Sequence, residues 1–179
     1  GIRMVADEDW DKGLTKEDGL WIAKKLSATK KIDFLNIIRG HIDTDASLTK
    51  VIPTQGMPSS PHLDFAGEIK LKTKFPVFHA SKINDVATAR HAVKEGKLDI
   101  VGMTRAHIAD PHIVRKINSG REDSIRPCVG ATYCLDRIYE GNEALCIHNP
   151  ATGREKFMPH EILTKTNNIK KILIVGAGP

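Results

Sequence analysis

Short apolar runs alternate with amphipathic stretches along most of this chain, and this alternation constrains the fold more than any other feature. The predicted strands span 1–5, 32–38, 75–79 and 98–103, and the predicted helices span 16–28, 84–96 and 110–119. A long loop rich in Pro, Ser and Gly is predicted over 39–68. Strands that alternate with helices form parallel sheets with crossover connections. The pattern therefore predicts an α/β fold, either half of an eight-stranded β/α barrel or an open doubly wound sheet.

Three helix starts carry capping signals. Thr15 followed by Asp18 resembles a capping box. Asn84 can cap the second helix, and Asp110 before Pro111 is a strong start for the third.

Polar loops follow the third and fourth predicted strands, each before a predicted helix. In β/α barrels the loops after the last two strands form the usual phosphate site. Backbone amides from both loops can converge on a phosphate, and an arginine can add a bidentate contact. The candidate phosphate-binding residues are Ala80, Ser81, Lys82, Gly102, Met103, Thr104 and Arg105.

All three cysteines, Cys128, Cys134 and Cys146, lie within 126–154. Thiolates gathered in one short loop-rich stretch indicate a metal or iron–sulfur site before they indicate disulfides. The segment 170–179, KKILIVGAGP, is typical of a buried strand that leads into a dinucleotide-binding turn. Gly176 and Gly178 would cradle the pyrophosphate of FAD or an adenine nucleotide. Together these segments indicate a redox enzyme.

Composition narrows the class of protein further. A hydrophobic content of 40% and no run near the ~18 apolar residues of a membrane span indicate a globular chain. The net charge of +5 is spread over the chain and only 5% of residues are aromatic, so nucleic-acid binding is disfavoured. No signal peptide is visible and the cysteine count is odd, which favours the cytoplasm. We also expect the chain to be an internal fragment.

The ordered motifs GIRM, GHIDTDA, FHASKIND, DIVGMTRAHIADP, RPCVGATYCLDRIYEGNEALCIHNPATGRE and KKILIVGAGP resemble those of one family. It is the old yellow enzyme class of flavin-dependent oxidoreductases, in its long iron–sulfur form, which includes 2,4-dienoyl-CoA reductase, trimethylamine dehydrogenase and N-methylproline demethylase-like enzymes. The resemblance implies the C-terminal half of an FMN-binding barrel (1–125), a cysteine-rich cluster segment (126–164), and a linker with the first strand of a truncated FAD- or NAD(P)H-binding domain (165–179).

The resemblance also implies roles for individual residues. Arg3 would stabilise the negative charge of reduced flavin. The two polar loops would bind the FMN phosphate. His41 and Asp45, in the loop after the second strand, would orient substrate or assist proton transfer. The aromatic cage of trimethylamine dehydrogenase aligns with Ile42 and roughly Ile138, so trimethylamine is disfavoured as a substrate.

The cysteine segment departs from the family at one position. The common pattern has four cysteines, and position 131 is Ala131 here. Four outcomes remain open: a three-iron cluster, a four-iron cluster with water or another side chain on the fourth iron, no cluster, or a zinc site that adds His148.

The function implied by the resemblance is FMN-dependent oxidative N-demethylation of a cyclic secondary or tertiary amine resembling N-methylproline. The alternatives are NAD(P)H-dependent reduction of an enoyl-CoA or enone and, in another class, a non-catalytic half-barrel remnant. We expect a small-molecule substrate and a homo-oligomeric intact protein without nucleic-acid or membrane partners. The fragment alone is expected to be inactive.

Overall fold

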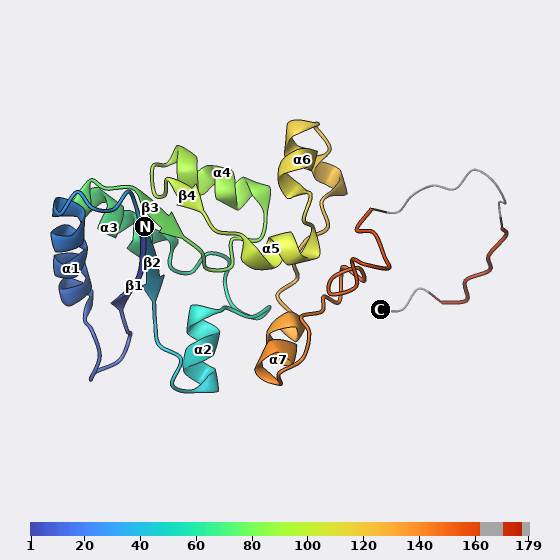
Figure 1. The fold of residues 1–179 in the computed structure, drawn as a ribbon, viewed down its shortest axis with the longest axis horizontal. Coiled ribbons are helices and arrows are strands. Elements are labelled where there is room, and N and C mark those ends of the chain that lie inside the picture. The colour runs from blue at the N-terminus through green and yellow to red at the C-terminus, as the bar shows by residue number, and fades with distance from the viewer. Residues whose placement is uncertain (162–169, 177–179) are drawn as a thin grey trace.

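The computed structural model describes residues 1–161 and 170–176 of the chain (Figure 1). One sheet holds four parallel strands, namely β1 (Ile2–Asp7), β2 (Leu35–Arg39), β3 (Val77–His79) and β4 (Ile100–Val101). Their order in the sheet is β1-β2-β3-β4. A doubly wound sheet reverses its strand order at a switch point, whereas successive strands of a β/α barrel lie side by side. The predicted parallel α/β sheet is confirmed, and its order is that of a barrel.

Three helices connect the strands and cover one face of the sheet. They are α1 (Lys16–Ala28), α3 (Leu63–Thr73) and α4 (Val86–Lys94). Ala23 of α1, Ile69 of α3 and Ala92 of α4 are buried in the same cluster as Leu35 and Ile37 of β2. Because one cluster contains all three helices, they lie on one side of the sheet, as the outer helices of a barrel do.

Side chains on the opposite face form a row across the sheet. Strand register aligns Arg3 with Asn36, Asn36 with Phe78, and Phe78 with Ile100. These residues alternate with the buried ones, so they point away from the helices. Ile100 is 42% exposed, which shows that the described residues leave this face partly open.

The first helix begins at the capping box and packs unusually close to the sheet. Thr15 Oγ1 accepts from Asp18 N at 3.3 Å, and the Asp18 carboxylate accepts from Thr15 N at 3.1 Å, so this prediction is confirmed. A Cβ atom on Gly19 would lie 2.0 Å from the backbone oxygen of Ala6. Glycine at this position therefore sets the distance between α1 and β1.

The prediction of one long loop over 39–68 is wrong. It contains α2 (Asp45–Val51) and most of α3. Thr44 caps α2 by accepting from Ser47 N at 3.2 Å. The α3 residues Ala66 and Ile69 are fully buried, so packing against the sheet stabilises a helix whose start lies beside a Pro- and Ser-rich stretch.

Several smaller helices and caps also differ from the prediction. The helices α5 (Thr104–Ala109) and α7 (Tyr133–Tyr139) lie in stretches predicted as loops, and a 3₁₀ turn spans Glu122–Ser124. Asp85, not Asn84, caps α4. The helix predicted to start at Asp110 begins later, as α6 (Ile113–Asn118). The Asp110 carboxylate instead accepts from His112 N in the turn before this helix. None of the helices within 1–161 or 170–176 is long and apolar enough to cross a membrane.

The strand predicted at the C-terminal end does not form within 170–176. These residues have no strand pairing, and Ile172, Leu173, Ile174 and Val175 are each at least 79% exposed. Figure 1 shows this segment extending away from the remainder of the chain. A strand needs backbone partners on a neighbouring strand, and the four strands of the sheet do not provide them here.

The close approach at Gly19 yields a test of the packing of α1. We expect Gly19→Ala to destabilise the chain by about 1–3 kcal/mol, because the new methyl group pushes α1 away from β1. Urea unfolding followed by the fluorescence of Trp10 and Trp21 measures the change. Gly56→Ala is the matched control, since a Cβ there meets nothing within 4 Å. Equal stability of the two variants would contradict this account.

Candidate functional site

A cavity of about 440 Å³ lies at the carboxyl ends of the strands. Parallel β/α sheets place their ligand sites at this end. All eight residues predicted within the barrel portion to contact a flavin line this one cavity. They are Arg3, Ala80, Ser81, Lys82, Gly102, Met103, Thr104 and Arg105. The structure thus brings together residues from β1 and from the loops after β3 and β4.

The loops after β3 and β4 touch each other at Gly102. A Cβ on Gly102 would lie 2.5 Å from the Ala80 Cβ and 2.6 Å from the Phe78 ring. Gly102 N donates to the His79 carbonyl oxygen at 2.9 Å. Because no side chain fits between them, the two loops form one continuous wall of the cavity.

Two polar atoms in this wall are buried without a hydrogen-bond partner among the described residues. They are Ser81 Oγ and Arg105 Nη1. Ser81 as a whole is 5% exposed. A buried donor without a partner is costly, so such atoms commonly mark the place of a ligand. One hydroxyl and one guanidinium nitrogen in the same wall suit an anionic group such as a phosphate.

Arg3 lies on the open face of the sheet and lines the cavity. None of the ion pairs found within the described ranges includes Arg3. A guanidinium that is not neutralised by a carboxylate is suited to an anionic ligand.

The ammonium group of Lys82 is hydrogen-bonded to a neighbouring loop and is not free to bind a ligand in the cavity. Lys82 Nζ donates to the carbonyl oxygens of Thr54, at 2.6 Å, and Gln55, at 3.1 Å, and also to that of Met57. Its backbone is left-handed, with φ of 49°. The ammonium thus joins the loop after β3 to residues 54–57. This contact positions the loop whose backbone amides were predicted to bind a phosphate.

His41 and Asp45 do not line the cavity. His41 Nδ1 donates to the Glu8 carbonyl oxygen at 3.0 Å, its Nε2 lies 3.0 Å from Ser47 Oγ, and its ring stacks on Trp10. Both ring nitrogens are therefore engaged. Asp45 is the first residue of α2 and is exposed, where its charge favours the helix N-terminus.

The loop that carries His41 and Asp45 contributes apolar residues to the cavity instead. Ile42 precedes α2, and Leu48 and Val51 lie on α2. His41 ties this loop to the loop after β1 and so supports the apolar wall. Sequence analysis identified the correct loop but selected its polar residues, which the α2 cap and the His41 contacts turn away from the cavity.

Another wall comes from α7 in the cysteine segment, of which sequence analysis named Ile138 from the resemblance but did not predict the helix. Leu135, Ile138 and Tyr139 line the cavity. Their i, i+3, i+4 spacing is a helical signal that the neighbouring cysteines obscured. Ile138 is 54% and Tyr139 62% exposed, so these side chains form an open, largely apolar mouth.

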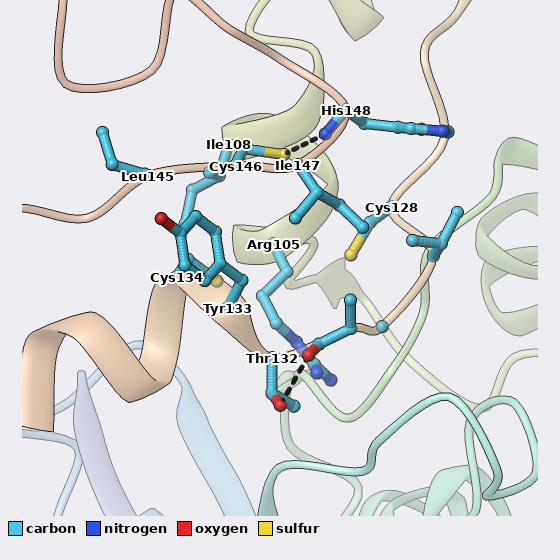
Figure 2. Close-up of a pocket in the computed structure, with 13 residues that line it drawn as sticks. Arg105, Ile108, Cys128, Thr132, Tyr133, Cys134, Leu145, Cys146, Ile147 and His148 are labelled. Carbon is cyan, nitrogen blue, oxygen red and sulfur yellow. Dashed lines mark hydrogen bonds between the residues drawn. The ribbon is translucent and has the colours of Figure 1, made fainter. Parts of the chain in front are cut away.

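A second cavity, of about 30 Å³, is lined by all three cysteines. Figure 2 shows Cys128, Cys134 and Cys146 around the Arg105 side chain. Ala131 lines the same cavity. All three thiols are free and half-buried. The predicted metal-binding cysteines are therefore brought together, and position 131 lies among them.

The surroundings of Cys134 favour its neutral thiol over the thiolate. Burial raises the pKa of the Cys134 thiol, and the neighbouring Cys128 and Cys146 raise it further, whereas Arg105 opposes them.

A single zinc ion does not fit the described residues. No group of three or more metal-ligating side chains within 1–161 and 170–176 is close enough together to hold one ion. His148 donates from Nδ1 to the Pro127 carbonyl oxygen at 2.8 Å, and its ring points away from the cysteines (Figure 2). The Cys₃His zinc alternative therefore lacks its fourth ligand.

Arg105, Ile108 and Cys134 line both cavities, so the two are neighbours. Arg105 and Ile108 lie on α5, directly after β4, and Cys134 lies in the first turn of α7. A group held by the cysteines would therefore lie next to a ligand of the larger cavity.

Asp110 anchors the beginning of the cysteine segment to the α/β portion of the chain. Its buried carboxylate accepts from Arg126 N at 2.9 Å, from Lys116 Nζ at 2.5 Å and from His112 N at 3.0 Å. These hydrogen bonds outweigh burial and hold the pKa of Asp110 below its ordinary value. The chain therefore enters the cysteine segment at a defined position.

Further hydrogen bonds anchor the rest of the cysteine segment to α5 and to the loop after β3. Asn149 Nδ2 and Thr152 Oγ1 donate to the Ile108 carbonyl oxygen at 3.1 and 3.0 Å, and Asn84 Nδ2 donates to that of Cys128 at 3.3 Å. The far end of the segment is thus anchored at α5, and its beginning is anchored at the loop after β3.

The predicted dinucleotide turn is only partly described. Gly176 has φ of 100°, a Cβ at this position would meet nothing within 4 Å, and Gly178 lies outside the described residues. The described part of this segment therefore does not form a pyrophosphate site.

Comparison with known proteins places these features in one family. The NADH:flavin oxidoreductase / NADH oxidase family matches residues 1–124. A probable N-methylproline demethylase of Rhizobium meliloti is 64% identical over the whole chain, which covers 26% of that relative. A multifunctional alkene reductase/demethylase of Caballeronia cordobensis is 47% identical over the whole chain, which covers 25% of it. An N,N-dimethylglycine/sarcosine dehydrogenase of Chromohalobacter salexigens is 43% identical over the whole chain, which covers 26% of that relative. The chain spans about a quarter of the length of each relative.

Solved structures agree with the fold. A complex of 2-naphthoyl-CoA reductase with 2-naphthoyl-CoA superposes with a TM-score of 0.77 at 28% identity, and the match covers 86% of this chain and 23% of that one. The 6-hydroxypseudooxynicotine amine oxidase of Pseudomonas geniculata superposes with a TM-score of 0.76 at 22% identity, over 92% of this chain and 24% of that one.

The role of Asp110 yields a pH-dependent prediction. Asp110→Asn removes the charge that Lys116 faces, and we expect a loss of about 2–3 kcal/mol of stability at pH 7. Because the folded pKa lies below the ordinary 3.8, the contribution of the carboxylate is present above 3.8 and is lost as pH falls through the folded value. The gap between wild type and variant in urea unfolding should therefore narrow below pH 4.

Asp123→Asn is the control for this experiment, since Asp123 is exposed. A gap for Asp110→Asn that stays constant down to pH 2, or one no larger than that of the control, would refute the assigned role.

Proposed function

Because the chain belongs to the NADH:flavin oxidoreductase / NADH oxidase family, we propose that it forms the last four β/α units of an FMN-binding barrel within a longer oxidoreductase. The unidirectional strand order and the helices on a single face support this assignment. The remaining strands would pair with the edge strands β1 and β4 and so enclose the open opposite face, where Ile100 is exposed.

FMN would occupy the larger cavity. Ser81 Oγ and Arg105, both with buried atoms that lack partners among the described residues, would bind its phosphate, and Arg3 would lie beside the flavin ring. The Gly102 contact keeps the two phosphate loops together. FMN supplies a two-electron acceptor when it is bound. The Arg3 side chain would stabilise the negative charge that the ring gains on reduction.

The favoured reaction is oxidative N-demethylation of an N-methyl amine resembling N-methylproline. Relatives at 64% and 43% identity are named for such amines. In this reaction the N-methyl carbon loses a hydride, and the iminium carbon that results takes up water and releases formaldehyde. The chain's part is to bind the amine: Ile42 and Ile138 offer aliphatic contacts, and Tyr139 offers one aromatic face.

Alkene reduction is the second candidate. The relative from Caballeronia cordobensis, at 47% identity, is named for both activities. An enone or enoyl substrate would accept a hydride from flavin that NAD(P)H has reduced. The apolar mouth formed by Leu135, Ile138 and Val51 suits such a substrate as well.

The cysteine cavity and the C-terminal residues would carry the electron-transfer functions of the intact enzyme. Cys128, Cys134 and Cys146 would hold an iron–sulfur cluster next to the flavin, and residues from 165 onward would lead into a domain that binds FAD or NAD(P)H. We further propose that the intact protein is a cytoplasmic homo-oligomer.

Flavin binding tests the assignment of the larger cavity. In the intact polypeptide that carries this segment, Arg105→Met should raise the dissociation constant for FMN by about 10- to 100-fold, since a charge-assisted contact is lost. Titration of the flavin-free protein by visible absorbance measures it. Arg121→Met, on an exposed turn outside the cavity, should leave the constant unchanged. Equal FMN dissociation constants for the wild type and Arg105→Met would show that Arg105 does not bind the FMN phosphate.

Substrate oxidation tests the reaction. Under anaerobic conditions N-methylproline should bleach the flavin absorbance of the intact protein and release one formaldehyde for each flavin reduced. Bleaching by NADH followed by recovery with an enone, without any response to N-methyl amines, would favour alkene reduction instead. A protein that binds no flavin and responds to neither would support the non-catalytic alternative.

A further inference from the structure

Three backbone carbonyl groups of one tight turn bind the Lys82 ammonium. The turn comprises residues 54–57 and is closed by Met57 N, which donates to the Thr54 carbonyl oxygen at 3.2 Å. Lys82 Nζ donates to the carbonyl oxygens of Thr54 at 2.6 Å and Gln55 at 3.1 Å, and to that of Met57. An ammonium group has three donors, so all of them are used here.

The shape of the 54–57 turn depends on this cation. Carbonyl oxygens carry partial negative charge, so three of them brought to one point repel each other unless a cation lies between them. None of the ion pairs formed within 1–161 and 170–176 includes Lys82. Gln55 is exposed, so water would compete for its carbonyl oxygen if the ammonium were removed.

The residues on either side of the turn are also held in place. The Lys82 carbonyl oxygen accepts from Ser60 N at 3.2 Å and from Ser59 Oγ at 3.1 Å. On the other side of the turn, Pro53 is buried and lines the larger cavity together with Ile52. The turn is therefore fixed between the wall of the larger cavity and the loop after β3.

The turn packs against the cysteine segment at Gly130. A Cβ on Gly130 would lie 3.2 Å from Gln55 N and 3.3 Å from Gln55 Cα, and Gly130 has φ of 72°. Glycine suits this backbone conformation and lets the two backbones touch. Gly130 lies three residues before α7, which carries Leu135, Ile138 and Tyr139 at the mouth of the larger cavity.

A second contact from the loop after β3 supports the same path. Asn84 Nδ2 donates to the Cys128 carbonyl oxygen at 3.3 Å. Asn84 follows Lys82 by two residues, and Cys128 precedes Gly130 by two. The loop after β3 therefore holds the chain before α7 both directly and through the 54–57 turn.

We propose that Lys82 is a positioning residue for substrate binding, because it holds the turn against which the start of α7 packs. Lys82 fixes the 54–57 turn, the turn fixes Gly130, and α7 then presents its apolar side chains at the mouth of the larger cavity. The inference rests on the proposed function for the identity of the substrate. Ser81 precedes Lys82, so one loop sets the positions of both the candidate phosphate site and the substrate mouth.

Hydrogen–deuterium exchange in the intact polypeptide tests this path. Lys82→Met removes the ammonium and keeps a side chain of similar length. We expect the backbone amides of 54–60 and 130–139 to exchange about 10- to 100-fold faster than in the wild type, because charge-assisted hydrogen bonds are lost. The amides of α1 should exchange at the wild-type rate. Lys94→Met, at an exposed lysine in the last turn of α4, is the matched control and should leave all rates unchanged.

Two outcomes of this experiment would overturn the inference. One is faster exchange confined to 54–60, with α7 at its wild-type rate. The other is faster exchange throughout the chain, since Lys82 would then stabilise the fold as a whole.

Gly130→Ala tests the second step of the path with Lys82 intact. The added Cβ would crowd the Gln55 backbone, so we expect the amides of α7 to exchange about 10-fold faster. Gly120→Ala is the matched control, because Gly120 also has a positive φ, of 69°, but a Cβ there meets nothing within 4 Å. Equal exchange of α7 in these two variants would overturn the inference, even where Lys82→Met does not fold.

Flavin reduction by N-methylproline tests the effect on substrate binding. With FMN at saturation, Lys82→Met should raise the substrate dissociation constant about 10-fold and change the limiting rate of flavin reduction less than about threefold, since α7 supplies binding contacts rather than reacting atoms. An unchanged dissociation constant would overturn the inference. A wild-type flavin that neither N-methyl amines nor NADH reduce would refute the proposed function, whereas the exchange experiments would still decide the role of Lys82.

Discussion

The buried carboxylate of Asp110 is the interaction on which the arrangement of the site depends. It accepts from the backbone of Arg126 and from the side chain of Lys116, and thereby directs the chain back toward the carboxyl ends of the strands after α6. If that turn were free, α7 would not lie over the carboxyl ends of the strands, and the larger cavity would lose the wall formed by Leu135, Ile138 and Tyr139. Both cavities therefore depend on one buried charge that is fully hydrogen-bonded.

The short helix α5 connects the two cavities. It begins three residues after β4 ends, so Arg105 reaches the wall of the larger cavity and also stands among the cysteines. The Ile108 carbonyl oxygen also joins α5 to the far end of the cysteine segment, because it accepts from Asn149 and Thr152. One cationic side chain would thus lower the energy of added electrons in both groups proposed to bind there.

Two kinds of element line the larger cavity, and they contribute side chains of different polarity. The strand ends and the loops after β3 and β4 contribute Arg3, Ser81 and Arg105, which suit an anionic cofactor. The helices α2 and α7 contribute apolar side chains, which suit the body of a small substrate. Sites on a rigid sheet with variable covering segments are a general property of β/α barrels, where changes in the loops alter specificity without altering the cofactor site.

Local patterns in the sequence determined the strands, the Thr15 capping box and the loops after β3 and β4, because each depends on neighbouring residues and on hydrophobic period. The helices α2 and α3 were missed within the predicted long loop, since burial of Ala66 and Ile69 against the sheet stabilises a helix whose surroundings are rich in Pro and Ser.

Only the tertiary structure decided which polar groups near the cavity are left without other hydrogen-bond partners. His41 and Lys82 have the right chemistry and the right position in the sequence, yet both ring nitrogens of His41 are engaged by Glu8 and Ser47, and the Lys82 ammonium is bound by the 54–57 carbonyls. The sequence by itself determined the fold class, the two polar loops after β3 and β4, and the three cysteines with their gap at Ala131. The structure decided which groups were free to bind a ligand, because hydrogen-bond partners that are distant along the chain meet only when it folds.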